Sequence, residues 1–255
     1  MRSTFLFAFL LLLTVPSFAQ KNGITTFSTI DALLSGIYDG PFSLKEVKKA
    51  GNMGIGTVNG LDGELLVYKN KAYAIKSDGV PYALPDSVKV PWATITQFKP
   101  GKALPLLPGW NYAACTAHID SFLTSLNYGY ALLVEGTFEL VKTRSVPRQQ
   151  PPYVKMTEIV KTQPVFMLER VEGIMVGFRF PSFVKGVNVP GYHFHFITKD
   201  RKAGGHVLDF KIAKAVVLVD QALQLSTILP EGEAFRNLSL EEDREEELKK
   251  VEKGQ

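Results

Sequence analysis

Histidines, which are potential metal ligands, are concentrated in one part of the sequence. Of the four histidines, His193, His195 and His206 fall within residues 192–210. His193 and His195 are two residues apart, so on a strand both side chains point to the same face. The polar, glycine-rich residues 200–205 predict a turn, and in the resulting hairpin His206 can lie opposite His195. Three imidazoles with an open fourth position form a catalytic Zn²⁺ site, because the open position admits water or substrate.

Other interpretations of these histidines have to be weighed. A single histidine on a strand is usually a packed or surface residue, and two histidines at this spacing are weak evidence for a metal. Three of the four on one predicted face favour a metal site. A structural zinc site typically takes four protein ligands, several of them cysteine, but the only cysteine, Cys115, is far away in the sequence. We therefore expect an open, reactive site, and we expect His118 to be an ordinary helix histidine.

A longer pattern surrounds the three histidines. The lead-in from Gly186, G-V-N-V-P-G-Y-H-F-H-F, and the following D-R-K-A-G-G-H-V-L-D-F resemble the acetolactate decarboxylase family. The pattern G-x-G-T-x-N-x-L-D-G-E is similar to the N-terminal motif of that family, whose threonine and glutamate line the active site and fall here on Thr57 and Glu64. K-T-R-S-V-P-R-Q resembles the active-site arginine segment, with Arg144 as the match. The catalytic glutamate near the C-terminus of the family falls, by spacing, on Glu252.

From the residues alone, these positions have more ordinary interpretations. A carboxylate such as Glu64 that opens an apolar strand is often a solvated strand end, and arginines in a proline-rich loop such as residues 144–152 are usually surface residues. Residues 239–255 are predicted to form a charged helix, with Ser239 and Glu242 as a capping box, which would normally be a solvated face. Their role in a site follows only from the resemblance.

The resemblance implies an enzyme, a carboxy-lyase that catalyses the zinc-dependent decarboxylation of (S)-2-acetolactate to (R)-acetoin and CO₂ in acetoin biosynthesis. The metal acts as a Lewis acid that stabilises an enediolate. Arg144 anchors the anionic substrate and helps to place the proton, Glu64 and Glu252 orient the substrate, and Thr57 forms a hydrogen bond nearby. The family also implies a homodimer. Two alternatives stay open: another exported zinc enzyme, such as a hydrolase or hydratase, and a non-catalytic metal-binding protein.

The elements that must position these residues are mostly strands. Residues 54–75 predict strand, turn, strand, turn and strand, with Glu64 opening the second strand. Apolar residues at helical spacing predict a helix over residues 28–38, and Ser43 with Glu46 predicts a capping box at the start of the next helix. The fold class expected is α+β, with mixed or antiparallel β-sheets and few short helices, two-lobed and similar to acetolactate decarboxylases. An N-terminal lobe would span residues 20–150, and a C-terminal lobe with the histidine hairpin and tail would span residues 151–255.

The first nineteen residues have the anatomy of a secretory signal peptide. Arg2 precedes an apolar run, residues 5–15, and Ser17-Phe18-Ala19 fits a cleavage site. The run is too short for a comfortable membrane span, which takes about 20 residues. We therefore expect an exported protein, periplasmic or extracellular, with no membrane partner after cleavage of residues 1–19.

Composition narrows the class of partner further. Hydrophobic residues make up 45% of the chain and charged residues 21%, which is typical of a globular protein. The formal net charge of +4 includes Arg2 and is too small to indicate a nucleic-acid partner. A single cysteine excludes an intramolecular disulfide. The expected partner is a small 2-hydroxy-3-oxo acid.

Overall fold

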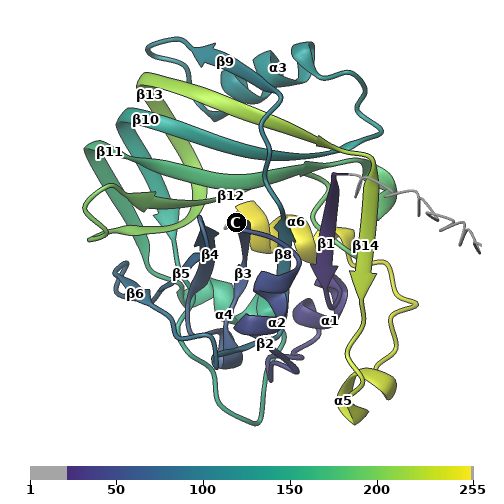
Figure 1. Ribbon diagram of the computed structural model, residues 1–255. Helices are drawn as coiled ribbons and strands as arrows, with labels where there is room; N and C mark the ends of the chain where they lie inside the picture. Colours follow the sequence, from purple (N-terminus) through teal and green to yellow (C-terminus); the bar gives the residue numbers. More distant parts are fainter. Residues whose placement is uncertain (1–21, 254–255) are drawn as a thin grey trace, which may run out of the picture.

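Two β-sheets make up most of the computed structural model, which describes residues 22–253. A five-stranded sheet lies above a seven-stranded sheet in Figure 1, and short helices lie around the lower sheet and on the outer face of the upper one. This arrangement confirms the predicted α+β class of mixed or antiparallel sheets with few short helices. The predicted signal peptide, residues 1–19, lies outside the described residues.

The seven-stranded sheet places three residues that line the candidate site side by side. Its strands, in spatial order, are β14 (Gln224–Ile228), β1 (Gly23–Phe27), β8 (Trp92–Thr96), β3 (Met53–Thr57), β4 (Glu64–Tyr68), β5 (Lys71–Ile75) and β6 (Pro81–Ala83). All pairings are antiparallel except that of β1 with β14. Thr57 pairs with Glu64 on one side and with Trp92 on the other. These three residues therefore form a row across one end of the sheet.

The five-stranded sheet is antiparallel throughout and closes on itself at one end. Its strands are β10 (Gly129–Arg144), β11 (Val165–Phe180), β12 (Gly191–Thr198), β13 (Gly204–Ala222) and β9 (Lys102–Leu106). β10 pairs with β11 on one side and with β13 on the other, and the start of β13 also pairs with β12. In that last pairing His195 lies opposite His206, and His206 in turn pairs with Arg144. The predicted hairpin is confirmed, with its turn at residues 199–203.

Apolar side chains fill the space between the two sheets. The strands that face this space are almost continuously buried, as all five residues of β3 are, because they are covered on both faces. The cluster between the sheets includes Ile24, Met53, Ile55, Leu66, Leu133, Val176 and Phe178. This apolar layer joins the two sheets that carry Glu64 and the histidines.

The helices are short, and three of them gather near the histidines. Their bounds are α1 (Ile30–Leu34), α2 (Leu44–Lys49), α3 (Tyr112–Phe122), α4 (Met156–Ile159), α5 (Glu233–Arg236) and α6 (Glu245–Lys253); β2 (Phe42–Ser43) and β7 (Lys89–Val90) form a small separate ladder. α1, α4 and α6 share one apolar cluster, which includes Ile30, Leu33, Trp92, Met156, Leu248 and Val251. The capping box predicted from Ser43 and Glu46 is present at the start of α2.

Two predicted helices are shorter in the structure than in the sequence analysis. α1 covers five residues, because Thr29 caps it by accepting a hydrogen bond from the Ala32 amide and the chain turns away at Gly36, with a φ of 99°. The tail helix begins at Glu245 rather than near Ser239. Glu242 does not cap a helix, because its carboxylate accepts a hydrogen bond from the Arg244 guanidinium.

The described part of the chain contains no helix that is long and apolar enough to cross a membrane. The division into lobes at residue 150 stays a prediction. β10, which precedes that position, is hydrogen-bonded along its length to β11 and β13, which follow it.

Candidate metal centre and active site

Three imidazoles meet at one point where β12 and β13 pair. His193 Nε2 lies 3.2 Å from His195 Nε2 and 3.1 Å from His206 Nδ1. A tetrahedral zinc ion with Zn–N bonds of 2.0–2.1 Å places its nitrogen ligands about 3.3 Å apart. The nitrogens are thus spaced as ligands of one small ion, and within residues 22–253 these three form the group that could hold a metal.

The hydrogen bonds that His195 and His206 make with backbone carbonyls also favour a cation between the three rings. His195 Nδ1 lies 2.8 Å from the Leu65 carbonyl oxygen and donates to it, while His206 Nε2 lies 3.2 Å from the Glu252 carbonyl oxygen and donates there. In the neutral rings, His195 Nε2 and His206 Nδ1 therefore present lone pairs to His193 Nε2. A single N–H on His193 can satisfy only one of them. A metal ion accepts electron density from all three nitrogens at once, so the residues fit a bound metal.

Burial keeps the imidazoles in the form that binds metals. All three rings are buried, and loss of solvation lowers the pKa of His195 to about 3. Burial, with the positive charge of Arg144 and the neighbouring rings, holds the pKa values of His193 and His206 well below the ordinary value. The rings are then neutral at physiological pH, with lone pairs available for coordination.

A buried ion pair lies beside the histidines. Arg144 Nη1 lies 2.6 Å from Glu64 Oε1, and both side chains are almost fully buried. The second oxygen, Glu64 Oε2, lies 3.5 Å from His195 Nε2, the nitrogen that faces the proposed ion. Burial raises the pKa of the Glu64 carboxyl, and Arg144 opposes that rise. Loss of one partner of such a pair costs about 3–5 kcal/mol, because the other charge is left uncompensated.

Arg144 has a donor left over for a ligand. Its Nη2 donates to the Val251 carbonyl oxygen at 3.2 Å, while its Nε is buried and has no hydrogen-bond partner among the described residues. The same is true of the Nε atoms of Arg179 and Arg244, but Arg144 is the arginine that lines the inner cavity, where this donor is available to a ligand. Thr57 pairs with Glu64 in the seven-stranded sheet, and its hydroxyl donates to the Gly63 carbonyl oxygen at 2.8 Å.

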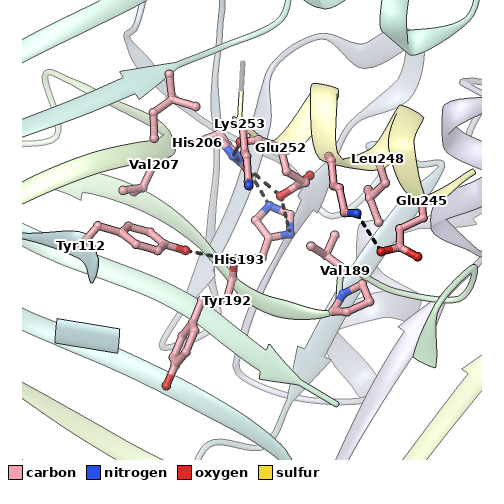
Figure 2. Close-up of a pocket in the computed structure, with 13 residues that line it drawn as sticks. Tyr112, Val189, Tyr192, His193, His206, Val207, Glu245, Leu248, Glu252 and Lys253 are labelled. Carbon is pink, nitrogen blue, oxygen red and sulfur yellow. Dashed lines mark hydrogen bonds and ion pairs between the residues drawn. The ribbon is translucent and has the colours of Figure 1, made fainter. Parts of the chain in front are cut away.

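The last turn of α6 fastens the other side of the site. Figure 2 shows Glu252 beside the rings of His193 and His206, and its Oε2 lies 3.8 Å from His193 Nδ1 and 3.8 Å from His206 Nε2. The last carbonyls of a helix lack partners inside the helix and carry partial negative charge. Here the carbonyls of Val251 and Glu252 are satisfied by Arg144 and His206. Burial raises the pKa of the Glu252 carboxyl to about 7, which suits proton transfer near neutral pH.

Two spaces adjoin these residues. An inner cavity of about 20 Å³ is lined by all the predicted site residues together with Trp92 and several apolar side chains. An outer pocket of about 530 Å³ (Figure 2) opens beside Tyr112, Tyr192 and α6. His193, His206 and Glu252 line both spaces. The candidate site is therefore a small chamber that adjoins a larger pocket at these three residues.

The structure brings together every residue that the sequence analysis assigned to the site: Thr57, Glu64, Arg144, His193, His195, His206 and Glu252. His118 lies elsewhere, on α3, where its ring contacts Trp110 and Phe122. The sequence analysis missed Trp92, whose ring stacks on His193 at a centroid distance of 5.9 Å. It also missed the carbonyl groups of Leu65 and Val251, because backbone acceptors leave no signal in residue types.

Comparison with known proteins agrees with this geometry. A family model described as alpha-acetolactate decarboxylase matches residues 24–242. The alpha-acetolactate decarboxylase of Methanosarcina mazei is 45% identical over 230 residues, which is 89% of this chain and 78% of that protein. The protein of the same name from Bacillus subtilis strain 168 is 39% identical over 214 residues, 84% of each chain.

A solved structure extends the comparison to the fold. The crystal structure of alpha-acetolactate decarboxylase from Bacillus subtilis strain 168 has a TM-score of 0.88 and 36% identity, and the match covers 91% of this chain and 100% of that one. The family match ends before Glu252, whose place in the site rests on the position of α6. Because sequence and fold agree over most of its length, the chain belongs to the alpha-acetolactate decarboxylase family.

Proposed function

We propose that this protein is a zinc enzyme that decarboxylates (S)-2-acetolactate to (R)-acetoin and CO₂. The proposal rests on one observation: three neutral, buried imidazole nitrogens face one another beside a buried arginine–glutamate pair. Members of the family are named for the same reaction. Zinc is the metal proposed because three imidazoles suit it and leave a coordination position for the substrate.

The reaction breaks the bond between the carboxylate carbon and C2 of the substrate. The electron pair of that bond stays with C2 and delocalises onto the neighbouring C3 oxygen as CO₂ departs. When bound, the metal supplies Lewis-acid stabilisation of the negative charge on the substrate oxygens. Protonation of C2 on one face then gives acetoin with a defined configuration.

The residues of the chain would hold the substrate and manage that proton. Arg144 is held by Glu64 and by the Val251 carbonyl, so its free Nε–H is fixed in place and can bind a substrate oxygen without reorganisation. Glu64 lies beside His195, while Glu252 lies beside His193 and His206. Burial raises the pKa of the Glu252 carboxyl to about 7, so Glu252 can carry a proton near neutral pH and deliver it to C2. Glu64 is paired with Arg144 and holds its guanidinium in place.

The direct test is formation of acetoin from racemic acetolactate by purified protein near neutral pH. We expect turnover in protein that contains one zinc ion per chain, loss of turnover after chelation, and recovery when zinc is restored. Tight zinc retention without turnover would instead indicate a non-catalytic metal-binding protein. Hydrolysis or hydration of other substrates by the same zinc-loaded protein, without acetoin formation, would indicate a different zinc enzyme.

Replacement of Glu64 by glutamine should separate catalysis from metal binding. The amide has the shape of the carboxylate and can still accept a hydrogen bond from Arg144, but it carries neither charge nor a transferable proton. We expect E64Q to retain one zinc per chain and to lose a factor of about 10²–10⁴ in kcat. E135Q is the matched control, because Glu135 contacts Tyr68 away from the site, and it should keep wild-type activity. Full activity in E64Q would remove Glu64 from the mechanism.

The histidines should differ sharply in their effect on metal content. We expect H193A, H195A and H206A each to be purified with far less than one zinc per chain, as measured by elemental analysis. Each variant keeps only two of the three imidazoles, and two are too few to hold the metal. H118A should bind one zinc, since the ring of His118 makes an edge-to-face contact with Trp110 outside the site. Equal zinc content in all four variants would place the metal elsewhere.

We also propose that the protein is a homodimer. β14 is an edge strand, and apolar side chains on and beside it are exposed, namely Leu223, Leu225, Ile228 and Leu229. Exposed apolar edge strands favour pairing with another chain. Light scattering should give the mass of two chains, and a monomer at micromolar concentration would contradict this.

We also propose that the protein is exported. Residues 1–19 have the basic start, the apolar run and the small-residue cleavage site of a signal peptide. Protein recovered from the periplasm or medium should begin at Gln20 by N-terminal sequencing. Recovery of the intact chain, with Met1 in place, from the cytoplasm alone would contradict export.

A further inference from the structure

The inner cavity has two chemically different walls. One wall is polar and consists of Thr57, Glu64, Arg144, His193, His195, His206 and Glu252. The other wall is apolar and consists of Ile30 and Leu33 from α1, Trp92 from β8, Val146 after β10, and Met156 from α4. All five apolar side chains are buried. The chamber therefore suits a small ligand with oxygens on one side and alkyl groups on the other.

The proposed substrate has that shape, and the argument here rests on the proposed function. Its carboxylate, hydroxyl and carbonyl oxygens match the polar wall, where the histidines and Arg144 gather. Once those oxygens are fixed, the alkyl group on C2 and the methyl group on C3 are the parts left to face the apolar wall. The wall thus determines which 2-alkyl-2-hydroxy-3-oxo acids fit.

The chamber has a volume of about 20 Å³, which holds roughly one water molecule. The substrate therefore needs further room, either from movement of a wall or from the outer pocket, which shares His193, His206 and Glu252 with the chamber. The polar wall resists movement, because Arg144 is hydrogen-bonded to both Glu64 and Val251. Trp92 is held in the middle of the seven-stranded sheet and stacks on His193. Within the apolar wall, the side chains from α1 and α4 are the ones that can move to make space for the substrate.

Met156 is the member of the apolar wall best able to yield. It opens α4, a four-residue helix that has no side-chain hydrogen bond at its N-cap, Lys155. Its unbranched side chain has more rotatable bonds than that of Ile30, which is branched at Cβ and stiff at χ1. Leu33 lies inside α1, whose N-terminus is capped by Thr29. The methionine can change rotamer to make room, up to the limit set by its own volume.

We propose that Met156 is a specificity-determining residue that sets the largest alkyl group accepted at C2 of the substrate. It acts through contact with that group and leaves the polar wall unchanged. One methylene in an apolar pocket changes discrimination by about 10- to 200-fold. A change in the volume of residue 156 should therefore shift the ranking of substrates that differ only in their C2 substituent.

The test compares the 2-methyl, 2-ethyl and 2-propyl members of the 2-hydroxy-3-oxobutanoate series. Relative to wild type, Met156→Ala should raise kcat/KM for the 2-propyl acid over the 2-methyl acid by about tenfold or more. Met156→Phe, the opposite change, should lower the same ratio. Met156→Leu nearly conserves volume and should leave it within about threefold. Met175→Ala is the matched control, because Met175 is fully buried in a different apolar cluster, and its ratio should equal that of wild type.

Binding of non-reactive analogues makes the test independent of turnover. The 2,3-dihydroxy-2-alkylbutanoates keep the oxygens but lack the ketone needed for loss of CO₂, so calorimetry can give their Kd values for each zinc-loaded variant. The Kd ratio of the 2-propyl and 2-methyl analogues should follow the same order as the kinetic ratio. If wild-type protein showed no turnover, the proposed function would be wrong. The Kd ratios would still test the role of Met156. Ratios that are unchanged in both Met156→Ala and Met156→Phe would overturn the inference.

Discussion

The structure depends on three buried imidazole nitrogens that face one another. β12 and β13 pair so that His195 lies opposite His206, and His193 lies two residues along the same face. Burial keeps the rings neutral, and the carbonyls of Leu65 and Glu252 fix which nitrogen carries the hydrogen. Two lone pairs then point at a third nitrogen, which can donate a hydrogen bond to only one of them, whereas a cation between the three nitrogens can accept from both.

The rest of the site follows from what surrounds that point. Arg144 is the residue paired with His206 on β10, so its positive charge must lie near the ligands, and Glu64 balances it from the other sheet at 2.6 Å. The C-terminal end of α6 places partial negative charge on the opposite side through its last carbonyls. The result is a small chamber with one charged wall and one apolar wall, and fixed charges in such a chamber can stabilise a developing negative charge.

The parts of this site that could be predicted were those with a local signal. Alternation along β12 and the glycine-rich turn before β13 were enough to place His195 opposite His206, because register in a hairpin follows from short-range geometry. The contact of Glu64 with Arg144 joins residues 80 apart in sequence, and no periodicity reports such a contact. The resemblance to a known family placed both residues in the site, but it did not predict that they pair. Trp92 and Met156 could not be singled out, since apolar residues that line a chamber look like core residues. The late start of α6 was missed because Glu242 bonds to the Arg244 side chain instead of capping a helix.

X-ray absorption at the metal edge of purified, zinc-loaded protein tests the central claim most directly. The account predicts a first shell with three imidazole nitrogens at about 2.0–2.1 Å, completed by light oxygen donors that are exchanged when a substrate analogue with a hydroxyl and a carboxylate is added. A shell with fewer than three imidazoles, or one closed by a fourth protein donor that the analogue cannot displace, would contradict it.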